Sequence, residues 1–120
     1  MTYDPNNIFA KILRGDIPSK KIYEDEFALA FYDLYPKAPV HVLVIPKGHY
    51  TDVVDFSSHA GASEITGFWQ AVAAVAHDLN LDQNGFRTIA NTGTHGGQEV
   101  PHFHVHLLGG KQMGAMVGEN

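Results

Sequence analysis

The 120-residue sequence contains no cysteine, which excludes disulfide bonds and thiolate zinc sites. It has no apolar run near the roughly 18 residues that a transmembrane helix requires, and no charged start followed by an apolar signal-peptide core. Basic residues are also few: 8 Lys and Arg stand against 13 Asp and Glu, giving a net charge of −5. We therefore expect a cytoplasmic protein that has no membrane partner and binds no nucleic acid, although a single nucleotide is compatible with this charge.

Short apolar segments with the composition of β-strands are present in both halves of the chain. The first two are separated by an acidic turn, which predicts an antiparallel hairpin. The third is the most apolar and ends at Pro46, so we expect it at the centre of a sheet. The four segments cover residues 20–24, 27–33, 41–45 and 86–90.

Two segments have helical periodicity. A short helix begins after Asn6 or Asn7, either of which can cap it, and ends at Gly15. A longer helix is expected over residues 63–79, where Gly67 permits close packing against a neighbour. We therefore predict an α+β domain over residues 1–120, with an antiparallel sheet of about five strands, one short N-terminal helix and one long helix.

Residues 102–107 alternate between histidine and an apolar residue, which is the period of a half-buried strand. His102, His104 and His106 would then share one face at intervals of about 6.6 Å, because a strand rises about 3.3 Å per residue. Three interpretations are open at this point. The histidines can be an accident of a solvated strand face, they can bind a metal ion, or one of them can act as a catalytic nucleophile.

The segment just before the histidines, residues 91–97, reads Asn-Thr-Gly-Thr-His-Gly-Gly. Glycine allows positive φ angles and close approach to the backbone, so successive N–H groups of such a loop can point toward one anion. An ordinary glycine-rich connection is equally compatible with the loop taken alone. Beside a row of histidines, however, the loop favours phosphate chemistry over a closed structural metal site.

Two more motifs flank the histidines: Gly96-Gly97-Gln98 precedes them, and Leu-Gly-Gly-Lys-Gln-Met follows at residues 108–113. With matching segments at 7–12, 30–33 and 38–49, the chain resembles the histidine triad (HIT) family, specifically its Hint branch of nucleoside phosphoramidases. The resemblance implies a HIT-like fold, a homodimer to which the long helix contributes, and a reaction without a metal or other cofactor.

The resemblance also implies a role for each histidine of the row. His104 is the expected nucleophile, which must be neutral to attack phosphorus and would form a covalent nucleotidyl-histidine. His102 is expected to support the site together with His41. His106 would hydrogen-bond the nonbridging phosphate oxygens or the departing group. His41 taken alone would be interpreted as an ordinary buried histidine.

Nucleotide-binding residues are carried over in the same way. Asp33 precedes a turn and in isolation reads as a turn or cap residue, but the matching family residue binds the ribose hydroxyls. A phosphate cradle is expected from Asn91 and from the backbone N–H groups around Gly97 and Glu99, with Gln98 in the same motif. The expected nucleobase pocket is apolar and consists of Phe9, Ile12, Phe31 and Leu34.

The expected function is hydrolysis of purine nucleoside 5′-phosphoramidates, either AMP-amine or guanosine conjugates or an aminoacyl-adenylate, with release of a nucleoside monophosphate. Two alternatives stay open. One is a dinucleoside polyphosphate hydrolase of the Fhit branch, which would use the same triad. The other is a regulatory module that binds zinc through His41, His102, His104 and His106.

The chain departs from the Hint pattern at three places. Glu99 stands where Ser or Thr is common, and Pro101 stands where an aromatic residue is common. The tail, residues 111–120, lacks the Trp-containing segment of the animal Hint proteins and is expected to lie loosely at the surface. The missing tail segment bears on the leaving-group preference. A Glu99 side chain this near a bound phosphate would repel it unless the side chain turns away, while the Glu99 backbone N–H can still donate.

Overall fold

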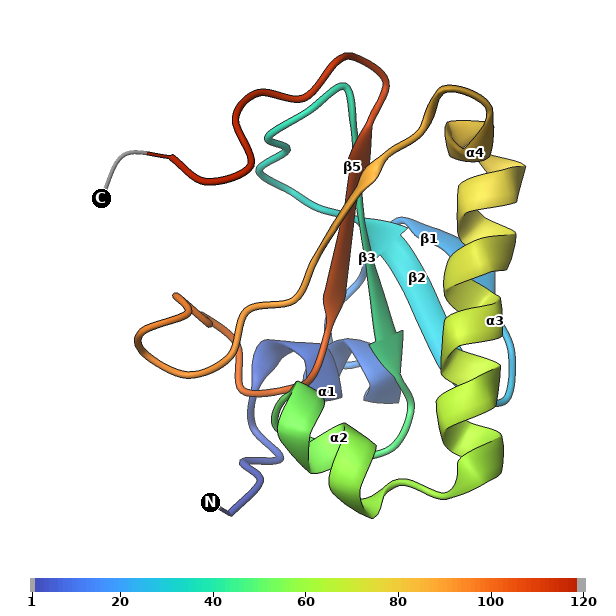
Figure 1. The fold of residues 1–120 in the computed structure, drawn as a ribbon. Coiled ribbons are helices and arrows are strands. Elements are labelled where there is room, and N and C mark those ends of the chain that lie inside the picture. The colour runs from blue at the N-terminus through green and yellow to red at the C-terminus, as the bar shows by residue number, and fades with distance from the viewer. Residues whose placement is uncertain (1, 119–120) are drawn as a thin grey trace.

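The computed structural model describes residues 2–118 and contains a five-stranded antiparallel sheet with helices (Figure 1). The strand order is β1-β2-β3-β5-β4, so the most apolar strand is central, as the sequence predicts. The elements are α1 (Ile8–Arg14), β1 (Lys21–Glu24), β2 (Ala28–Tyr32), β3 (Val40–Pro46), α2 (Val53–His59), α3 (Ala62–Asp78), α4 (Leu81–Asn84), β4 (Arg87–Ile89) and β5 (Val105–Gly109).

The two predicted helices form, and local chemistry explains their ends. The Asn7 side chain caps α1 by accepting the N–H of Ala10 at 2.9 Å, and Gly15 ends the helix with a left-handed φ of 82°. Gly67 lets α3 pack closely against Phe27, in the turn before β2. A Cβ at this position would overlap the Phe27 ring, so no larger residue fits without a rearrangement.

The sheet has two different faces, because alternate residues of a strand point in opposite directions. On β3, Val42 and Val44 pack in the main core, which α3 covers on one side of the sheet (Figure 1). Leu43 and Ile45 lie on the other face, in a smaller apolar cluster with α1. Since α1 is short, it covers only part of this second face and leaves room beside it for a cavity.

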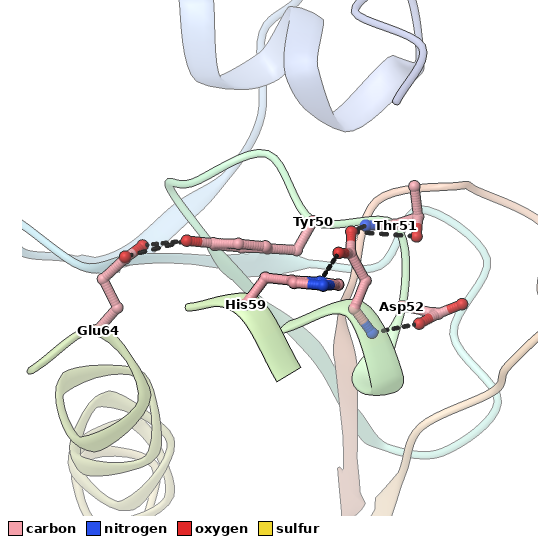
Figure 2. A network of polar contacts seen from close by, with 6 residues as sticks. Tyr50, Thr51, Asp52, His59 and Glu64 are labelled. Carbon is pink, nitrogen blue, oxygen red and sulfur yellow. Dashed lines mark hydrogen bonds and ion pairs between the residues drawn. The ribbon is translucent and has the colours of Figure 1, made fainter. Parts of the chain in front are cut away.

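The short helices α2 and α4 were not predicted from the sequence. A polar network at the start of α2 shows what stabilises it (Figure 2). Asp52 caps the helix by accepting the N–H of Asp55 at 2.8 Å, and Asp55 in turn binds Thr51 and His59. This network fixes the loop that follows β3 and therefore also positions the segments that hydrogen-bond to that loop.

The predicted strand over residues 102–107 is shorter than expected, since β5 begins at Val105. Val105 pairs with Val44 of β3, and the next residues of β3 lead to Pro46. Proline has no N–H to donate, and the Pro46 carbonyl accepts a hydrogen bond from the His102 ring instead. The regular ladder therefore ends before His104, and the three histidines do not share one strand face.

Among residues 2–118 no helix is both long and apolar enough to cross a lipid bilayer.

Candidate active site

A cavity of about 650 Å³ lies on the sheet face opposite α3. One end is apolar, where α1 meets β2 and β3. The other end carries imidazoles and the loop between β4 and β5, which projects on the side away from α3 (Figure 1). The predicted site residues in its lining are Phe9, Ile12, Phe31, Asp33, Leu34, His41, Asn91, Gly97, Glu99, His104 and His106. His102 and Gln98 are the two predicted site residues outside the lining.

His104 is held in a single tautomer. Its Nδ1 lies 2.7 Å from the backbone carbonyl of His102, and a carbonyl only accepts hydrogen bonds, so Nδ1 carries the proton. The lone pair of Nε2 is therefore free, and the ring lines the cavity. Burial lowers the pKa of His104, which keeps the imidazole neutral near pH 7. A neutral ring with one free lone pair is the form that can attack an electrophile.

His106 is held in the opposite tautomer by a chain of hydrogen bonds. The backbone N–H of Lys37 donates to His41 Nδ1 at 3.0 Å, which leaves the proton of His41 on Nε2. That Nε2 donates to His106 Nδ1 at 3.0 Å and lies 3.4 Å from a carboxylate oxygen of Asp33. The proton of His106 is therefore on Nε2. Burial and the neighbouring imidazoles lower the pKa of His106 to about 4, so it is a neutral N–H donor.

His41 thus holds one imidazole of the row in a single tautomer. Its ring bonds to His106 and not to His102, whose nitrogens bond to Tyr3 and Pro46. His41 is buried beside Asp33. Desolvation lowers its pKa, against the raising effect of the Asp33 charge.

His102 is fully buried and faces away from the cavity. Its Nε2 donates to the Pro46 carbonyl at 2.9 Å, and its Nδ1 accepts the hydroxyl of Tyr3 at 2.6 Å. Burial lowers the pKa of His102 to about 4, so the ring stays neutral. The backbone carbonyl of His102 therefore positions His104. The side chain of His102 holds the segment before β5 against Tyr3 and Pro46.

The sequence does not predict the contact of Tyr3 with His102. The two residues are 99 positions apart, and no sequence pattern links them. The Tyr3 ring also stacks on His49, with centroids 4.5 Å apart and an interplanar angle of 7°. Tyr3 thus joins His49 and His102 in a layer beneath the histidine row, and the N-terminal segment reaches this layer.

Tyr3→Phe is expected to lower the free energy of unfolding by about 1–3 kcal/mol, because it leaves His102 Nδ1 buried without a donor. Urea denaturation at pH 7 measures the change. Tyr23→Phe is the matched control: the partner of Tyr23 is Asp25, which keeps hydrogen bonds from two backbone N–H groups. An equal loss in both variants would contradict the role of Tyr3.

Gln98 supports the loop and does not enter the cavity. Its amide nitrogen donates to the carbonyls of Thr51 at 2.6 Å and Val100 at 3.0 Å, and its oxygen accepts the N–H of Gly93 at 3.0 Å. These bonds occupy both the nitrogen and the oxygen of the Gln98 side chain, so this side chain is not placed to contact a nucleotide. The Gln98 bonds join the loop to the fixed turn that precedes α2.

The other groups of the expected phosphate cradle differ in whether their N–H donors are free to bind a phosphate. Asn91 donates to the Gly96 carbonyl at 2.7 Å, and its side chain still borders the cavity. Gly97, with φ at 74°, turns its N–H inward to the Thr94 carbonyl at 3.1 Å, so this donor is already used. Within residues 2–118, the N–H of Glu99 has no hydrogen-bond partner and is free to meet an anion.

The zinc ligand set proposed from the sequence is not assembled, since both nitrogens of His102 are bonded elsewhere. A different group is close enough for a metal ion: one ligand atom each from Asp33, His41 and His106, all within 4.8 Å of one another. The short hydrogen bond between the two imidazoles explains this proximity without an ion.

Comparison with known proteins identifies the family of the chain. The HIT domain family matches residues 14–113. A HIT-like protein from Azospirillum brasilense is 52% identical over 116 residues, which are 97% of this chain and 95% of the relative. The purine nucleoside phosphoramidase of Escherichia coli K12 is 44% identical over 111 residues, 92% of each chain.

Solved structures give the same result. A histidine triad protein from Clostridium difficile superposes with a TM-score of 0.86 at 41% identity, covering 97% of this chain and all of that one. A HIT family hydrolase from Clostridium thermocellum has a TM-score of 0.85 at 42% identity, covering 93% and 96%. By sequence and by fold, this chain belongs to the HIT domain family.

Proposed function

We propose that this protein hydrolyses purine nucleoside 5′-phosphoramidates through a covalent nucleotidyl-histidine. The observation that carries the proposal is the hydrogen bond from His104 Nδ1 to the His102 carbonyl, which leaves Nε2 as a nucleophile inside the cavity. The similarity to the Escherichia coli purine nucleoside phosphoramidase supports the substrate class.

In this proposal the substrate lies along the cavity from its apolar end to its polar end. The purine packs among Phe9, Ile12 and Phe31, which are buried and apolar. Asp33 accepts the ribose hydroxyls: its Oδ1 already binds the N–H of Tyr35 at 2.8 Å, and a carboxylate has lone pairs left for two more donors. Leu34, 76% exposed, borders the opening of this part of the cavity.

The first chemical step forms a bond between His104 Nε2 and phosphorus and breaks the P–N bond of the substrate. The substrate nitrogen takes up a proton from solvent before the P–N bond breaks and leaves as a neutral amine, while His106 Nε2–H hydrogen-bonds it. The hydrogen bond from His41 to His106 Nδ1 holds His106 in this tautomer. The Glu99 N–H and the Asn91 amide hold phosphate oxygens. Each such preset donor contributes about 3 to 4 kcal/mol in well-studied enzymes.

The second step hydrolyses the intermediate. Water attacks phosphorus and loses one proton to solvent, while the bond from phosphorus to His104 Nε2 breaks and its electron pair returns to Nε2. The products are a nucleoside monophosphate and a free amine, and both imidazoles end in their starting protonation states. Every group in both steps belongs to the chain, so the proposed reaction needs no cofactor.

The direct test is turnover after treatment with a chelator. We expect a fluorogenic adenosine 5′-phosphoramidate to be hydrolysed at an undiminished rate, and at least about tenfold faster in kcat/KM than a diadenosine polyphosphate. Faster cleavage of the diadenosine compound would favour the dinucleoside polyphosphate hydrolase. Activity that disappears with the chelator and returns with zinc would overturn the metal-free mechanism.

The homodimer is proposed as well. On α3, Trp69 is 42% exposed although it is a large aromatic residue, which is compatible with a partner on this helix. Sedimentation at micromolar concentration is expected to give twice the 13.1 kDa mass of the chain. A mass of one chain would contradict the dimer. The cytoplasmic location stays a prediction from the sequence.

A further inference from the structure

Glu99 is a charged group of the cavity that the proposed steps do not use through its side chain. It lines the cavity together with His104 and His106, and it is exposed. Among residues 2–118 its carboxylate has neither a hydrogen bond nor an ion pair. Asp33, the other acidic residue of the lining, is by contrast bonded to Tyr35 and close to His41.

The position of Glu99 is fixed by its neighbours in the chain. Gln98, directly before it, bonds to the carbonyls of Thr51 and Val100, so the backbone on both sides of Glu99 is tied to the body of the protein. The charge of Glu99 acts on His104 and raises its pKa, in opposition to the stronger effect of burial. The carboxylate is therefore held near the nucleophile.

The shape of the cavity indicates which part of a substrate meets this carboxylate. The apolar end fits the purine, Asp33 fits the ribose, and His104 with His106 fits the phosphorus atom. Whatever is attached beyond phosphorus must continue from the buried imidazoles toward solvent. Two lysines, Lys20 and Lys37, also line the cavity, and the charge of Lys37 acts on His41.

We propose that Glu99 makes the enzyme selective for leaving groups that carry a second, positive charge, that is, for nucleoside phosphoramidates of diamines. An ammonium group beyond the scissile nitrogen gains attraction from the unpaired carboxylate, whereas an anionic leaving group is repelled. This inference rests on the proposed function and names the substrate class within it.

The test uses two AMP conjugates of equal length, one of 1,5-diaminopentane with a free terminal ammonium and one of 5-aminopentanol with a neutral hydroxyl. We expect the wild type to prefer the ammonium conjugate about three- to fivefold in kcat/KM, since exposed charge pairs give effects of up to this size. Glu99→Gln is expected to reduce the ratio to about one. A high salt concentration should reduce the wild-type ratio as well, because it screens the pair.

Glu26→Gln is the matched control. Glu26 is exposed and outside the cavity lining, so this variant changes the net charge equally and should keep the wild-type ratio. Turnover of both conjugates at the same rate by the wild type would overturn the selectivity alone, as would an unchanged ratio in Glu99→Gln. If the wild type hydrolyses neither conjugate, the proposed function fails and this inference fails with it.

Discussion

His104→Ala is expected to lower kcat/KM for an adenosine phosphoramidate by about 10³-fold or more, since loss of a catalytic nucleophile has effects of this size or larger. The variant has no atom that can bond to phosphorus at this place. His106 cannot replace it, because the lone pair of its Nδ1 accepts the hydrogen bond from His41 and its Nε2 carries a proton. The measurement is initial rate with a fluorogenic conjugate, for wild type and variant.

His95→Ala is the control for this experiment. His95 is exposed, lies outside the cavity lining and makes no hydrogen bond among residues 2–118, so its removal should leave the rate unchanged. AMP binding, followed by calorimetry, should persist in His104→Ala because the apolar end and Asp33 are untouched. Retention of a tenth or more of the wild-type rate would contradict the assignment of the nucleophile.

A second measurement detects the intermediate itself. Wild-type protein quenched in acid during turnover should carry an added nucleotidyl mass, and proteolytic fragments should place it on the segment that contains His104. The same treatment of His104→Ala should give an unmodified chain. An adduct on the fragment of another histidine would transfer the role of nucleophile to that residue.

The sequence predicted the parts of the fold that depend on local chemistry. The apolar run ending at Pro46 is the central strand, and Asn7 and Gly15 bound the first helix, because a cap and a left-handed glycine act on the residues next to them. The long helix α3 is confirmed within one residue at each end, since its apolar stripe is long enough to be unambiguous.

The sequence could not predict features that depend on distant partners. Alternation placed His102 on the same face as His104, but Pro46 ends the ladder and takes up the His102 ring, and this follows only from the pairing of β3 with β5. The hydroxyl of Tyr3 reaches His102 from the far end of the chain. Gln98 likewise appeared as a nucleotide ligand, because a motif does not tell which side chains of a loop are used within the protein.

Acidification is expected to destabilise the protein already between pH 6.5 and pH 4, and His102 and His106, whose pKa values burial lowers to about 4, contribute most. The pKa of His102 is about 4 in the folded protein and about 6.5 when unfolded, so below pH 6.5 the unfolded chain binds more protons. The free energy of unfolding therefore falls as pH decreases through this window. The difference in pKa corresponds to about 3 kcal/mol, lost in full only below pH 4.

Carboxylates contribute in a different range. Asp25 and Asp55 have lowered pKa values because N–H and O–H groups hydrogen-bond their charged forms. Such a group contributes stability above its unfolded pKa, near 4, and that stability is lost as pH falls through the still lower folded pKa. Their effect thus begins where that of His102 is nearly complete, so the interval from pH 6.5 to pH 4 reports mainly on buried histidines.

His102→Gln isolates the contribution of this one ring, because the Gln amide can still donate to the Pro46 carbonyl but has no titratable group. Urea denaturation is expected to show a less stable variant at pH 7 whose loss between pH 7 and pH 4 is smaller than that of the wild type by about 3 kcal/mol. His77→Gln is the control of opposite sign. Asp82 raises the pKa of His77, so this histidine stabilises the protein below its unfolded pKa and the effect is lost as pH rises. The free energy of unfolding of His77→Gln should therefore fall slightly more steeply with acidification than that of the wild type. If the free energies of wild type and His102→Gln instead change in parallel with pH, His102 is not kept neutral by burial.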